Sequence, residues 1–416
     1  MPALLRSNWA TLRSSPLALG FALLSIANLA GAALSFAASL IIIHAGGAAL
    51  FGQISLALTV TNYALLFAVM GTDVSAVRIA AAKPDQIPEL LWSVFLLRLT
   101  VSVAAFALIW VALHFLKIPH LTKLLILLSL LSLFVNSIYP LWLPQALEHF
   151  KTAAICILGV HALNFALTAV AATWELGAPA FALTKVAGEF AVAIALMFWA
   201  ALTYRQWHLT FAKVVALAQE SFPIVTSQVV RGASFASDII IVGIFFTPAV
   251  VGHYSAAYRV FTLLLSFGSM YFVALFPKLS RQANEDSGLL RRELRSSLRR
   301  ALLATSVGSG LLMLLSPWIL RQLFGAGFEE ATLSFQLLLA ALVANVLQRN
   351  YGRALLASGH ARWELRGTII ATVFGVSLKV IATKFLGISG TAGATLATEI
   401  LLLVLQRRYL KTLLTD

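Results

Sequence analysis

The stretch SDIIIVGIFFTPAVVGHYSAAYRVFTLLLSF, residues 237–267, contains two apolar segments joined by the short turn TPAV. Each segment, extended to its flanking charges, exceeds the ~20 residues that an α-helix needs to cross a ~30 Å hydrocarbon core. The sequence therefore predicts a hairpin of two membrane-spanning helices, near residues 219–246 and 250–275. Asp238 and Arg259 nevertheless lie inside these spans, where a charge is costly.

Apolar segments of this length recur along most of the 416 residues. Sixty per cent of the residues are hydrophobic, 11% are charged and the mean hydropathy is +0.91, values far outside those of soluble domains. We predict an all-α, polytopic membrane protein with about 12 transmembrane helices. The spans are expected near residues 17–43, 50–72, 89–114, 121–143, 152–174, 180–203, 219–246, 250–275, 300–320, 331–357, 365–386 and 390–410.

The charges between the spans predict the orientation. The formal net charge is +14, and only Lys117, Lys123, Arg321 and Lys384 fall on the side opposite the N-terminus. This asymmetry follows the positive-inside rule and predicts that both termini are cytoplasmic. The nine tryptophans all fall near predicted span ends, as an interfacial belt requires. The placement of the charges therefore indicates a multi-pass membrane protein in contact with membrane lipid, with no nucleic acid partner.

A weak internal repeat divides the chain. FGQISLAL at residues 51–58 and VGHYSAAY at residues 251–258 each open the second helix of a six-helix half, and they match at Gly52/Gly252, Ser55/Ser255 and Ala57/Ala257. Two halves with an even number of spans have parallel topology. We expect an N-terminal six-helix lobe at residues 1–207 and a C-terminal six-helix lobe at residues 208–416, around a central cavity.

Ionisable residues inside spans are candidates for function because they are costly there. They are Arg98, Lys185, Glu189, Arg231, Asp238, Arg259, Arg349, Lys379 and Glu399. Most are basic, which favours an anionic cargo. Asp238 and Arg259 lie at equal distances from the TPAV turn, so a salt bridge between them is expected, either as a structural clasp or as a functional pair.

Arg231 lies seven residues before Asp238, on nearly the same helix face and about 10 Å deeper. A guanidinium there suits a phosphate through bidentate hydrogen bonds, although an arginine bonded to carbonyl groups or to water fits equally well. Lys185 and Glu189 have the i, i+4 spacing of a pair within one helix. The remaining charges form either packing bridges or secondary charged sites of the cavity: Arg98, Arg349, Lys379 and Glu399.

Other chemistry has little support in the sequence. His44 and His253, near outer span ends, are candidates for proton coupling together with Asp238, but interfacial histidines without such a role are common. No cluster has metal-ligand spacing and no G-x-x-x-x-G-K-[ST] loop occurs, so we expect no metal, no cofactor and no enzymatic activity.

The order of several motifs resembles the bacterial polysaccharide flippases of the multidrug/oligosaccharidyl-lipid/polysaccharide exporter superfamily. The seventh and eighth helices of that family show an aspartate, a loop like "vG.Y..a.r" and a later proline, here Asp238, Gly252, Tyr254, Ala257, Arg259 and Pro277. Its closing pattern is similar to Leu356, Ala357 and Gly359, followed by Gly387, Gly390 and Gly393. FGQISLALTVTNYALLFAVMGTDVSAVRIAA, residues 51–81, resembles its second helix.

The resemblance implies alternating-access transport of a polyprenyl-pyrophosphate-linked oligosaccharide across the cytoplasmic membrane. It also implies that helices one, two, seven and eight line the cavity, which directs attention to Asn28, His44, Gln53, Asn62, Arg231, Asp238 and Arg259. The expected partners are a lipid-linked anionic glycan of lipopolysaccharide or exopolysaccharide synthesis and the polymerase and glycosyltransferases of that pathway. We expect the chain to act as a monomer.

Two other transporter classes stay open. A drug/cation antiporter of the same superfamily fits the fold, but the first span has no carboxylate. A major-facilitator-type solute carrier should carry the loop G-x-x-x-D-R/K-x-G-R/K-R/K after its second helix. GTDVSAVRIA, residues 71–80, has the first glycine and the aspartate but lacks the second glycine and the basic pair.

Overall fold

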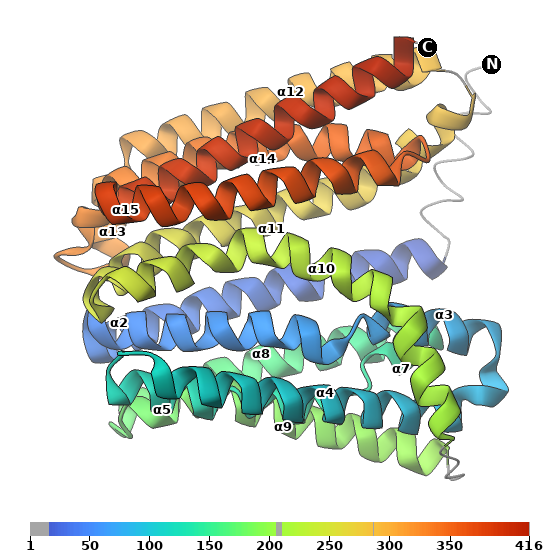
Figure 1. The fold of residues 1–416 in the computed structure, drawn as a ribbon, viewed down its shortest axis with the longest axis horizontal. Coiled ribbons are helices and arrows are strands. Elements are labelled where there is room, and N and C mark those ends of the chain that lie inside the picture. Colours follow the sequence, from blue (N-terminus) through green and yellow to red (C-terminus); the bar gives the residue numbers. More distant parts are fainter. Residues whose placement is uncertain (1–15, 205–209, 286, 416) are drawn as a thin grey trace. The chain divides into compact units, whose positions relative to one another are not determined.

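The computed structural model describes residues 16–204, 210–285 and 287–415, and these ranges are almost entirely helical, without a strand (Figure 1). Lipid offers no hydrogen-bond partner to an exposed peptide group, and a helix satisfies its own backbone groups internally. The helices are α2 (Pro16–Val69), α3 (Thr72–Ala82), η1 (Pro84–Gln86), α4 (Ile87–Phe115), α5 (His120–Ser129), α6 (Ser132–Ser137), α7 (Trp142–Ala146), α8 (Phe150–Thr173), α9 (Ala178–Thr203), α10 (Phe211–Phe245), α11 (Pro248–Glu285), α12 (Ser287–Leu314), α13 (Ser316–Phe324), η2 (Phe328–Ala331), α14 (Thr332–Ala357) and α15 (Ala361–Thr415).

Eight helical segments among the described residues, or nine with the bent pair α12 and α13, are long and apolar enough to cross a membrane. Helices α2 and α15 contain 54 and 55 residues, about 80 Å each, which is enough for two crossings apiece. Each is interrupted by a glycine with positive φ, Gly47 at 68° and Gly387 at 67°, a conformation that L side chains rarely adopt. These breaks fall at predicted connections, so the described helices are consistent with about twelve spans.

The predicted hairpin of residues 237–267 is present. Helix α10 ends at Phe245 and α11 begins at Pro248, where the fixed φ of proline suits the first turn of a helix and its missing N–H costs no hydrogen bond. Asp238 and Arg259 therefore lie well inside two successive long helices, as the sequence indicates.

The described residues pack into two compact units. Unit 1 contains the residues up to 41 and residues 61–228, and unit 2 contains residues 42–60 and those from 229 onward. The expected lobe boundary at residues 207 and 208 lies outside the described residues. By packing, the helical segment 42–60 belongs with the C-terminal helices and the first part of α10 belongs with the N-terminal ones.

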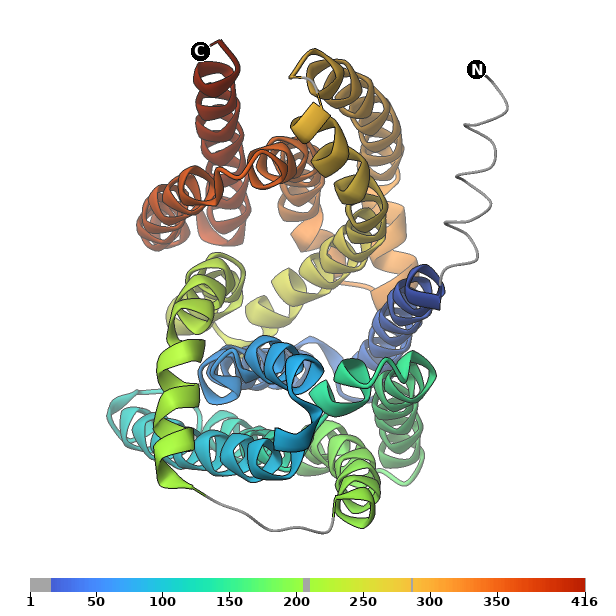
Figure 2. The same cartoon turned by 90° about the vertical axis from the view of Figure 1, so that its right-hand side faces the viewer.

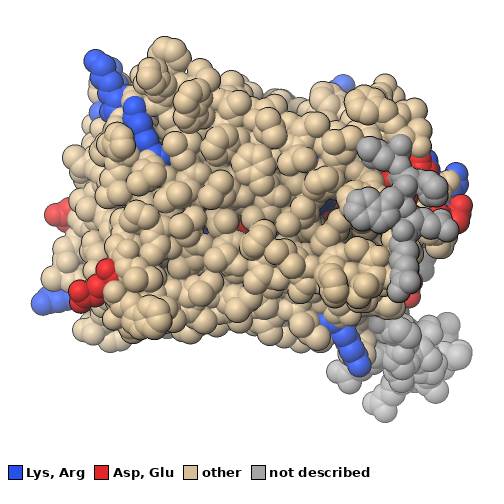
Figure 3. All heavy atoms as spheres, turned by 90° about the horizontal axis from the view of Figure 1, so that it is seen from below, with Lys and Arg blue, Asp and Glu red and all other residues tan. Residues whose placement is uncertain are grey.

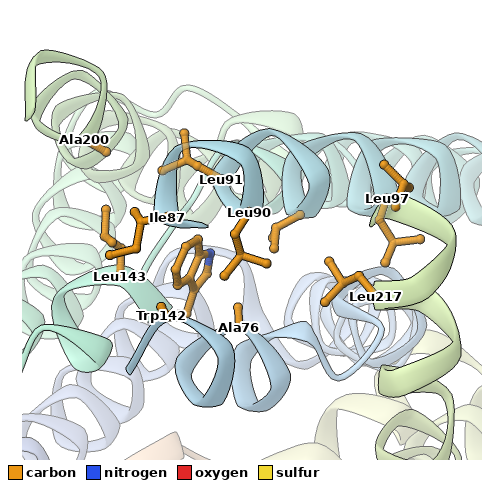
Figure 4. Packing of buried hydrophobic residues seen from close by; sticks show 12 residues of the cluster. Ala76, Ile87, Leu90, Leu91, Leu97, Trp142, Leu143, Ala200 and Leu217 are labelled. Atoms are coloured by element: carbon orange, nitrogen blue, oxygen red, sulfur yellow. The ribbon is translucent and has the colours of Figure 1, made fainter. Parts of the chain in front are cut away.

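In unit 1, α4, α5, α8 and α9 run side by side (Figure 1) and are seen roughly along their axes in Figure 2. A core at one end of this unit brings together Ala76 of α3, Leu91 of α4, Trp142 of α7 and Leu217 of α10 (Figure 4). Trp142 is 1% exposed, so it belongs to the protein core and not to the interfacial belt expected from its place near a span end. Trp174, 72% exposed, fits that belt.

The surface also has the character of a membrane protein. On the face drawn in Figure 3, lysine, arginine, aspartate and glutamate gather toward two opposite ends, and the broad band between them is almost free of charge. Apolar side chains such as Leu108 (71% exposed) and Phe198 (65% exposed) are accessible in unit 1. Large exposed apolar areas of this kind are stable against lipid and not against water.

In unit 2, the glycines of the predicted repeat meet each other. A Cβ atom added to Gly52 would lie 1.9 Å from the carbonyl oxygen of Pro248 and 2.6 Å from the backbone nitrogen of Gly252. A Cβ atom added to Gly252 would lie 1.9 Å from the carbonyl oxygen of Ala48. The two helices thus touch backbone to backbone, and only glycine permits this approach.

Helix α14 is the centre of unit 2, because α11, α12 and α15 all pack against it. Its C-terminal end forms a small apolar core in which Ala354 and Leu355 contact Leu294 of α12 and Leu410 of α15. On the N-terminal side of this core, α14 presents a polar face to α10 and α15. The candidate functional site lies at this polar face.

Candidate functional site

Asp238 of α10 is completely buried, and both oxygens of its carboxylate have polar partners. Its carboxylate forms an ion pair with the ammonium group of Lys379 on α15. Its Oδ2 accepts hydrogen bonds from the hydroxyl of Tyr254 on α11 (2.8 Å) and from Oγ1 of Thr395 on α15 (2.9 Å). A buried carboxylate is tolerated only when it is paired and hydrogen-bonded in this way.

Lys379 is equally well held. Its side chain is 1% exposed, and Nζ also donates to the carbonyl oxygen of Ser234 (2.6 Å) and to Oγ of Ser237 (3.2 Å). Two of the three donors of the ammonium group are used in these hydrogen bonds, and the Asp238 carboxylate lies against the group as an ion pair. The pair is therefore a fixed structural element of unit 2 rather than an open binding group.

The prediction of a salt bridge between Asp238 and Arg259 is wrong, because Asp238 pairs with Lys379 instead. The prediction rests on equal depth in the membrane, and depth does not determine which side of a helix faces a neighbouring helix. Tyr254 faces Asp238, and Arg259 follows it by five residues, which is a rotation of about 140° around α11. Among the described residues, Arg259 has no carboxylate partner.

A polar cavity of about 430 Å³ lies within unit 2, between α10, α14 and both parts of α15. Its volume falls in the range of about 300–1,000 Å³ that is typical of small-molecule sites. Three arginines and two glutamates line it, so the formal charge of the lining is +1: Arg231, Arg349, Arg353, Glu364 and Glu399. Side-chain amides, threonine hydroxyls and a few apolar groups complete the lining.

Arg231 is the most accessible of the paired cations in this cavity. Its Nη1 lies 2.9 Å from Oε1 of Glu364, and its side chain is 46% exposed while that of Glu364 is 9% exposed. Glu364 also accepts a hydrogen bond from Thr368 (3.3 Å) one turn later. The Glu364 carboxylate is thus held in place by its neighbours, whereas the exposed part of the Arg231 guanidinium is available to bind a ligand.

The second charged group of the cavity lies between α14 and α15. Arg349 lies within electrostatic range of Glu399 and of Arg353, four residues further along the same face of α14. Glu399 is 5% exposed and lies beside Asn345 and Arg349. Arg231, Arg349 and Glu399, which the sequence identified separately, therefore share one cavity.

The cavity and the Asp238–Lys379 pair are neighbours. Ser234 lines the cavity, and its carbonyl oxygen is the one that accepts from Lys379. Glu399 lies close enough to Lys379 and Asp238 to interact electrostatically with both. The buried pair thus lies next to the charged site and holds α10 against α15.

Most other predicted site residues lie elsewhere. In unit 1, Arg98 is 2% exposed and bonds Thr72 (2.7 Å), Asp73 (2.5 Å) and the carbonyl groups of Asn136 and Tyr139 (3.3 Å each), so it acts as a packing bridge.

The predicted amides have different surroundings. Asn62 accepts a hydrogen bond from Lys185 (2.6 Å), which also lies 3.6 Å from Glu189 as the i, i+4 spacing predicts. Asn28 donates to its own helix at Leu24 (2.8 Å). Gln53 is half-buried in unit 2 and does not line the cavity.

The two histidines differ from each other. Nδ1 of His253 lies 3.2 Å from Oε2 of Glu330 on η2, and the ring packs edge to face against Phe328. His44 lies on the exposed side of α2, three residues before the break at Gly47. Neither histidine lines the cavity.

Sequence reasoning missed several cavity residues. Glu364 lies one residue before a predicted span, and Arg353 lies near the end of the predicted span 331–357, where the positive-inside rule alone accounts for a basic residue. Asn345, Gln348 and Gln406 carry no charge, so the cost of burying a charge does not single them out. The available signal was a polar stripe at helical spacing on α14, because Asn345, Arg349 and Arg353 recur every four residues.

No group of three or more histidine, cysteine, aspartate or glutamate side chains that could hold a metal ion occurs among the described residues. The arrangement in unit 2 offers guanidinium groups, amides and two carboxylates instead. These are groups that bind anions and polyols rather than transition metals.

Comparison with known sequences gives a family match and a curated relative. Residues 17–283 match the model of a family described as "Polysaccharide biosynthesis protein". Over 176 residues the chain is 26% identical to the "Probable low-salt glycan biosynthesis flippase Agl15" of Haloferax volcanii. That match covers 42% of this chain and 37% of the relative, just over a third of the relative's length.

Comparison with solved structures shows a shared transporter fold. An inward-facing multidrug resistance MATE family transporter of the MOP superfamily is similar with a TM-score of 0.75 and 12% identity, over 92% of this chain and 94% of that one. The lipid II flippase MurJ in an inward closed conformation is similar with a TM-score of 0.74 and 15% identity, over 94% of this chain and 87% of that one. At these identities the likeness concerns the fold.

Proposed function

Because the chain belongs to the polysaccharide biosynthesis protein family, we propose that it is a flippase for a polyprenyl-pyrophosphate-linked oligosaccharide. The observation that carries the proposal is the arginine-lined cavity inside unit 2. A lipid-linked glycan has a hydrocarbon tail that stays in the bilayer and a charged, hydrated headgroup that does not. Its carrier must therefore shelter that headgroup, and a cavity lined by cations and neutral polar groups does so.

Arg231 is the proposed primary contact for the pyrophosphate. A guanidinium binds phosphate oxygens through two parallel hydrogen bonds, and the partly exposed side chain of Arg231 can do so while Glu364 stays in place. Arg349 and Arg353 add positive charge to the same cavity. Their combined field favours a dianionic or more highly charged group over a neutral one.

The orientation is proposed from the positive-inside rule. With both termini cytoplasmic, the end of α14 and the start of α15 lie on the cytoplasmic side, and the cavity between them opens toward the inner leaflet. This is the side on which lipid-linked glycans are assembled before export. We place the protein in the bacterial cell membrane, acting as a monomer beside the glycosyltransferases and polymerase of a lipopolysaccharide or exopolysaccharide pathway.

The two six-helix lobes, residues 1–207 and 208–416, remain part of this proposal. Alternating access requires two bodies that move relative to a central site, and the repeat built on Gly52 and Gly252 supports an origin from two equivalent halves. The protein is proposed to act as a carrier without enzymatic activity of its own.

A drug/cation antiporter is the second candidate, because the fold is shared with a MATE family transporter. An antiporter needs an accessible carboxylate for its cation. Asp238 does not meet this need, since Lys379 occupies it, and the cavity that contains Glu364 and Glu399 has a net positive lining. These charges favour the flippase.

The test is a flipping assay in proteoliposomes. A polyprenyl-pyrophosphate disaccharide with a fluorescent label on the sugar is incorporated, and its transfer is followed with a membrane-impermeant quencher. Arg231→Ala is expected to reduce the transfer rate about 10- to 100-fold, since a charge-assisted hydrogen bond contributes about 1.5–3 kcal/mol. Arg362→Ala is the matched control, because Arg362 is an exposed arginine of α15 that does not line the cavity.

Equal rates for wild type, Arg231→Ala and protein-free liposomes would refute the proposal. Proton- or sodium-linked exchange of an organic cation by the same proteoliposomes would support the antiporter instead.

A further inference from the structure

One part of the cavity lining differs in chemistry from the arginines. It consists of Asn345 on α14 and Glu399 and Gln406 on the last part of α15, with exposures of 1%, 5% and 1%. Oδ1 of Asn345, Oε2 of Glu399 and Oε1 of Gln406 are buried without a well-aligned hydrogen bond among the described residues, although the Asn345 amide and the Glu399 carboxylate lie close enough to interact with each other. Each such atom costs about 1–3 kcal/mol unless something else in the site bonds it.

Gly352 positions one of these groups. A Cβ atom at Gly352 would lie 3.1 Å from Oε1 and 3.2 Å from Nε2 of Gln406, so the bare backbone of α14 makes room for the amide. Asn345 lies seven residues before Gly352 and Glu399 seven residues before Gln406, about 10 Å in each case. This part of the lining therefore has two polar levels, with Arg349 and Arg353 on the same side of α14.

These groups do not suit a second phosphate. The Glu399 carboxylate repels an anion, and a side-chain amide offers an acceptor as well as donors. Hydroxyl groups fit both, since each O–H can donate to a carboxylate or amide oxygen and accept from an amide N–H. Phe235 adds an aromatic surface to the same cavity, and the apolar face of a pyranose ring packs well against such a surface.

We infer that Asn345, Glu399 and Gln406 bind the sugar attached directly to the pyrophosphate and determine which sugar is accepted. The inference rests on the proposed function and adds a substrate specificity to it. The carrier would recognise the first sugar of the glycan in the same cavity in which an arginine binds the pyrophosphate. A site built to hydrogen-bond a hydroxyl group rejects an analogue that lacks or inverts it, because its own polar atoms stay unpaired.

The experiment compares probes and variants in two assays. Stabilisation of the purified protein against heat is measured with inorganic pyrophosphate, with the 1-phosphates of glucose, galactose and N-acetylglucosamine, and with their neutral methyl glycosides. Flipping is measured for pyrophosphate-linked lipids that carry each of the three first sugars. The wild type is expected to prefer one sugar at least about tenfold in flipping and to show the same order in stabilisation by the sugar probes.

Asn345→Leu and Gln406→Met keep the side-chain size and remove the amide. Each is expected to lower the preference to less than about threefold while stabilisation by inorganic pyrophosphate is unchanged. Asn345→Gln, which keeps the amide and moves it, is expected to change the order of preference. Gln336→Met is the matched control, because Gln336 is an α14 amide that bonds Met313 and Ser316 outside the cavity.

The outcomes separate the two proposals. Pyrophosphate-dependent stabilisation with equal flipping of all three sugars, or a preference that survives both amide-removing variants, would overturn the sugar site and leave the flippase intact. Absence of flipping and of pyrophosphate binding would refute the flippase. In that case thermal stabilisation by the three neutral methyl glycosides still tests the sugar site. Equal stabilisation by all three would overturn it.

Discussion

Replacement of Lys379 by methionine tests the central charge pair of unit 2 directly. The substitution keeps most of the side-chain volume and removes the ammonium group that bonds Asp238, the carbonyl group of Ser234 and the hydroxyl of Ser237. Asp238 keeps the hydrogen bonds from Tyr254 and Thr395, but both reach only Oδ2. Oδ1 is then left without its cation in a site that water does not reach.

Breaking a buried ion pair by removing one partner costs about 3–5 kcal/mol. The two remaining donors place the expected cost near the lower end, about 3 kcal/mol. For a unit of about 150–250 residues, each kcal/mol shifts the melting temperature by about 2–4 °C, so we expect a loss of about 6–12 °C.

The assay is thermal unfolding of detergent-solubilised protein, followed by fluorescence-detected gel filtration. Lys384→Met is the control, because Lys384 is an exposed lysine of the same helix, and a change of less than about 2 °C is expected for such a surface site. The double variant Asp238→Asn/Lys379→Met removes both charges and should be more stable than Lys379→Met alone. A single variant that melts with the wild type, or a double variant that is no more stable than the single one, would refute the reasoning.

Two further predictions concern packing. Gly252→Val is expected to abolish the folded, monodisperse fraction in gel filtration, because its Cβ atom would lie 1.9 Å from the carbonyl oxygen of Ala48. The control is Gly308→Val on α12, which should be recovered in wild-type yield because no atom lies within 4 Å of the added Cβ atom. A well-behaved Gly252→Val protein would contradict the close contact. Arg98→Met should destabilise the protein by about 1–3 kcal/mol, seen as a lower melting temperature, because it leaves the Thr72 hydroxyl and two carbonyl groups without their donor. Asp73 contributes little to this cost, because its side chain is 51% exposed and water can solvate it. An unchanged melting temperature would show that Arg98 is not a packing bridge.

The helices could be predicted from the sequence because their cause is local. Hydropathy and length define a span, and glycine or proline ends it, so Gly47, Gly387 and Pro248 fall where the sequence expects a connection. The same logic failed for Trp142. Its position near a span end predicts an interface, but the packing of α3, α4 and α7 encloses it in protein.

The partners of the buried charges were not predictable in the same way. Counting residues from a turn gives the depth of Asp238, but the identity of its partner depends on how α15, more than a hundred residues later, is rotated against α10. Hydropathy also assigns charges at span ends to the surface, so Arg353 and Glu364 were not recognised as cavity residues. Individual charges were identified from their cost in lipid, whereas their grouping is a property of the three-dimensional fold.

The contact between Gly52 and Gly252 has a consequence for biogenesis. Residues 42–60 leave the ribosome early, yet they complete unit 2, whose remaining residues begin at residue 229, within α10. At about 5–20 residues per second, the partner of Gly52 is synthesised roughly 10–40 s later. During that interval the glycine face of this helix has only lipid, or an insertion factor, to lie against. A C-terminal fragment that begins after residue 209 lacks the helix that Gly252 touches, so the second unit is not an autonomous folding module of the later half of the chain.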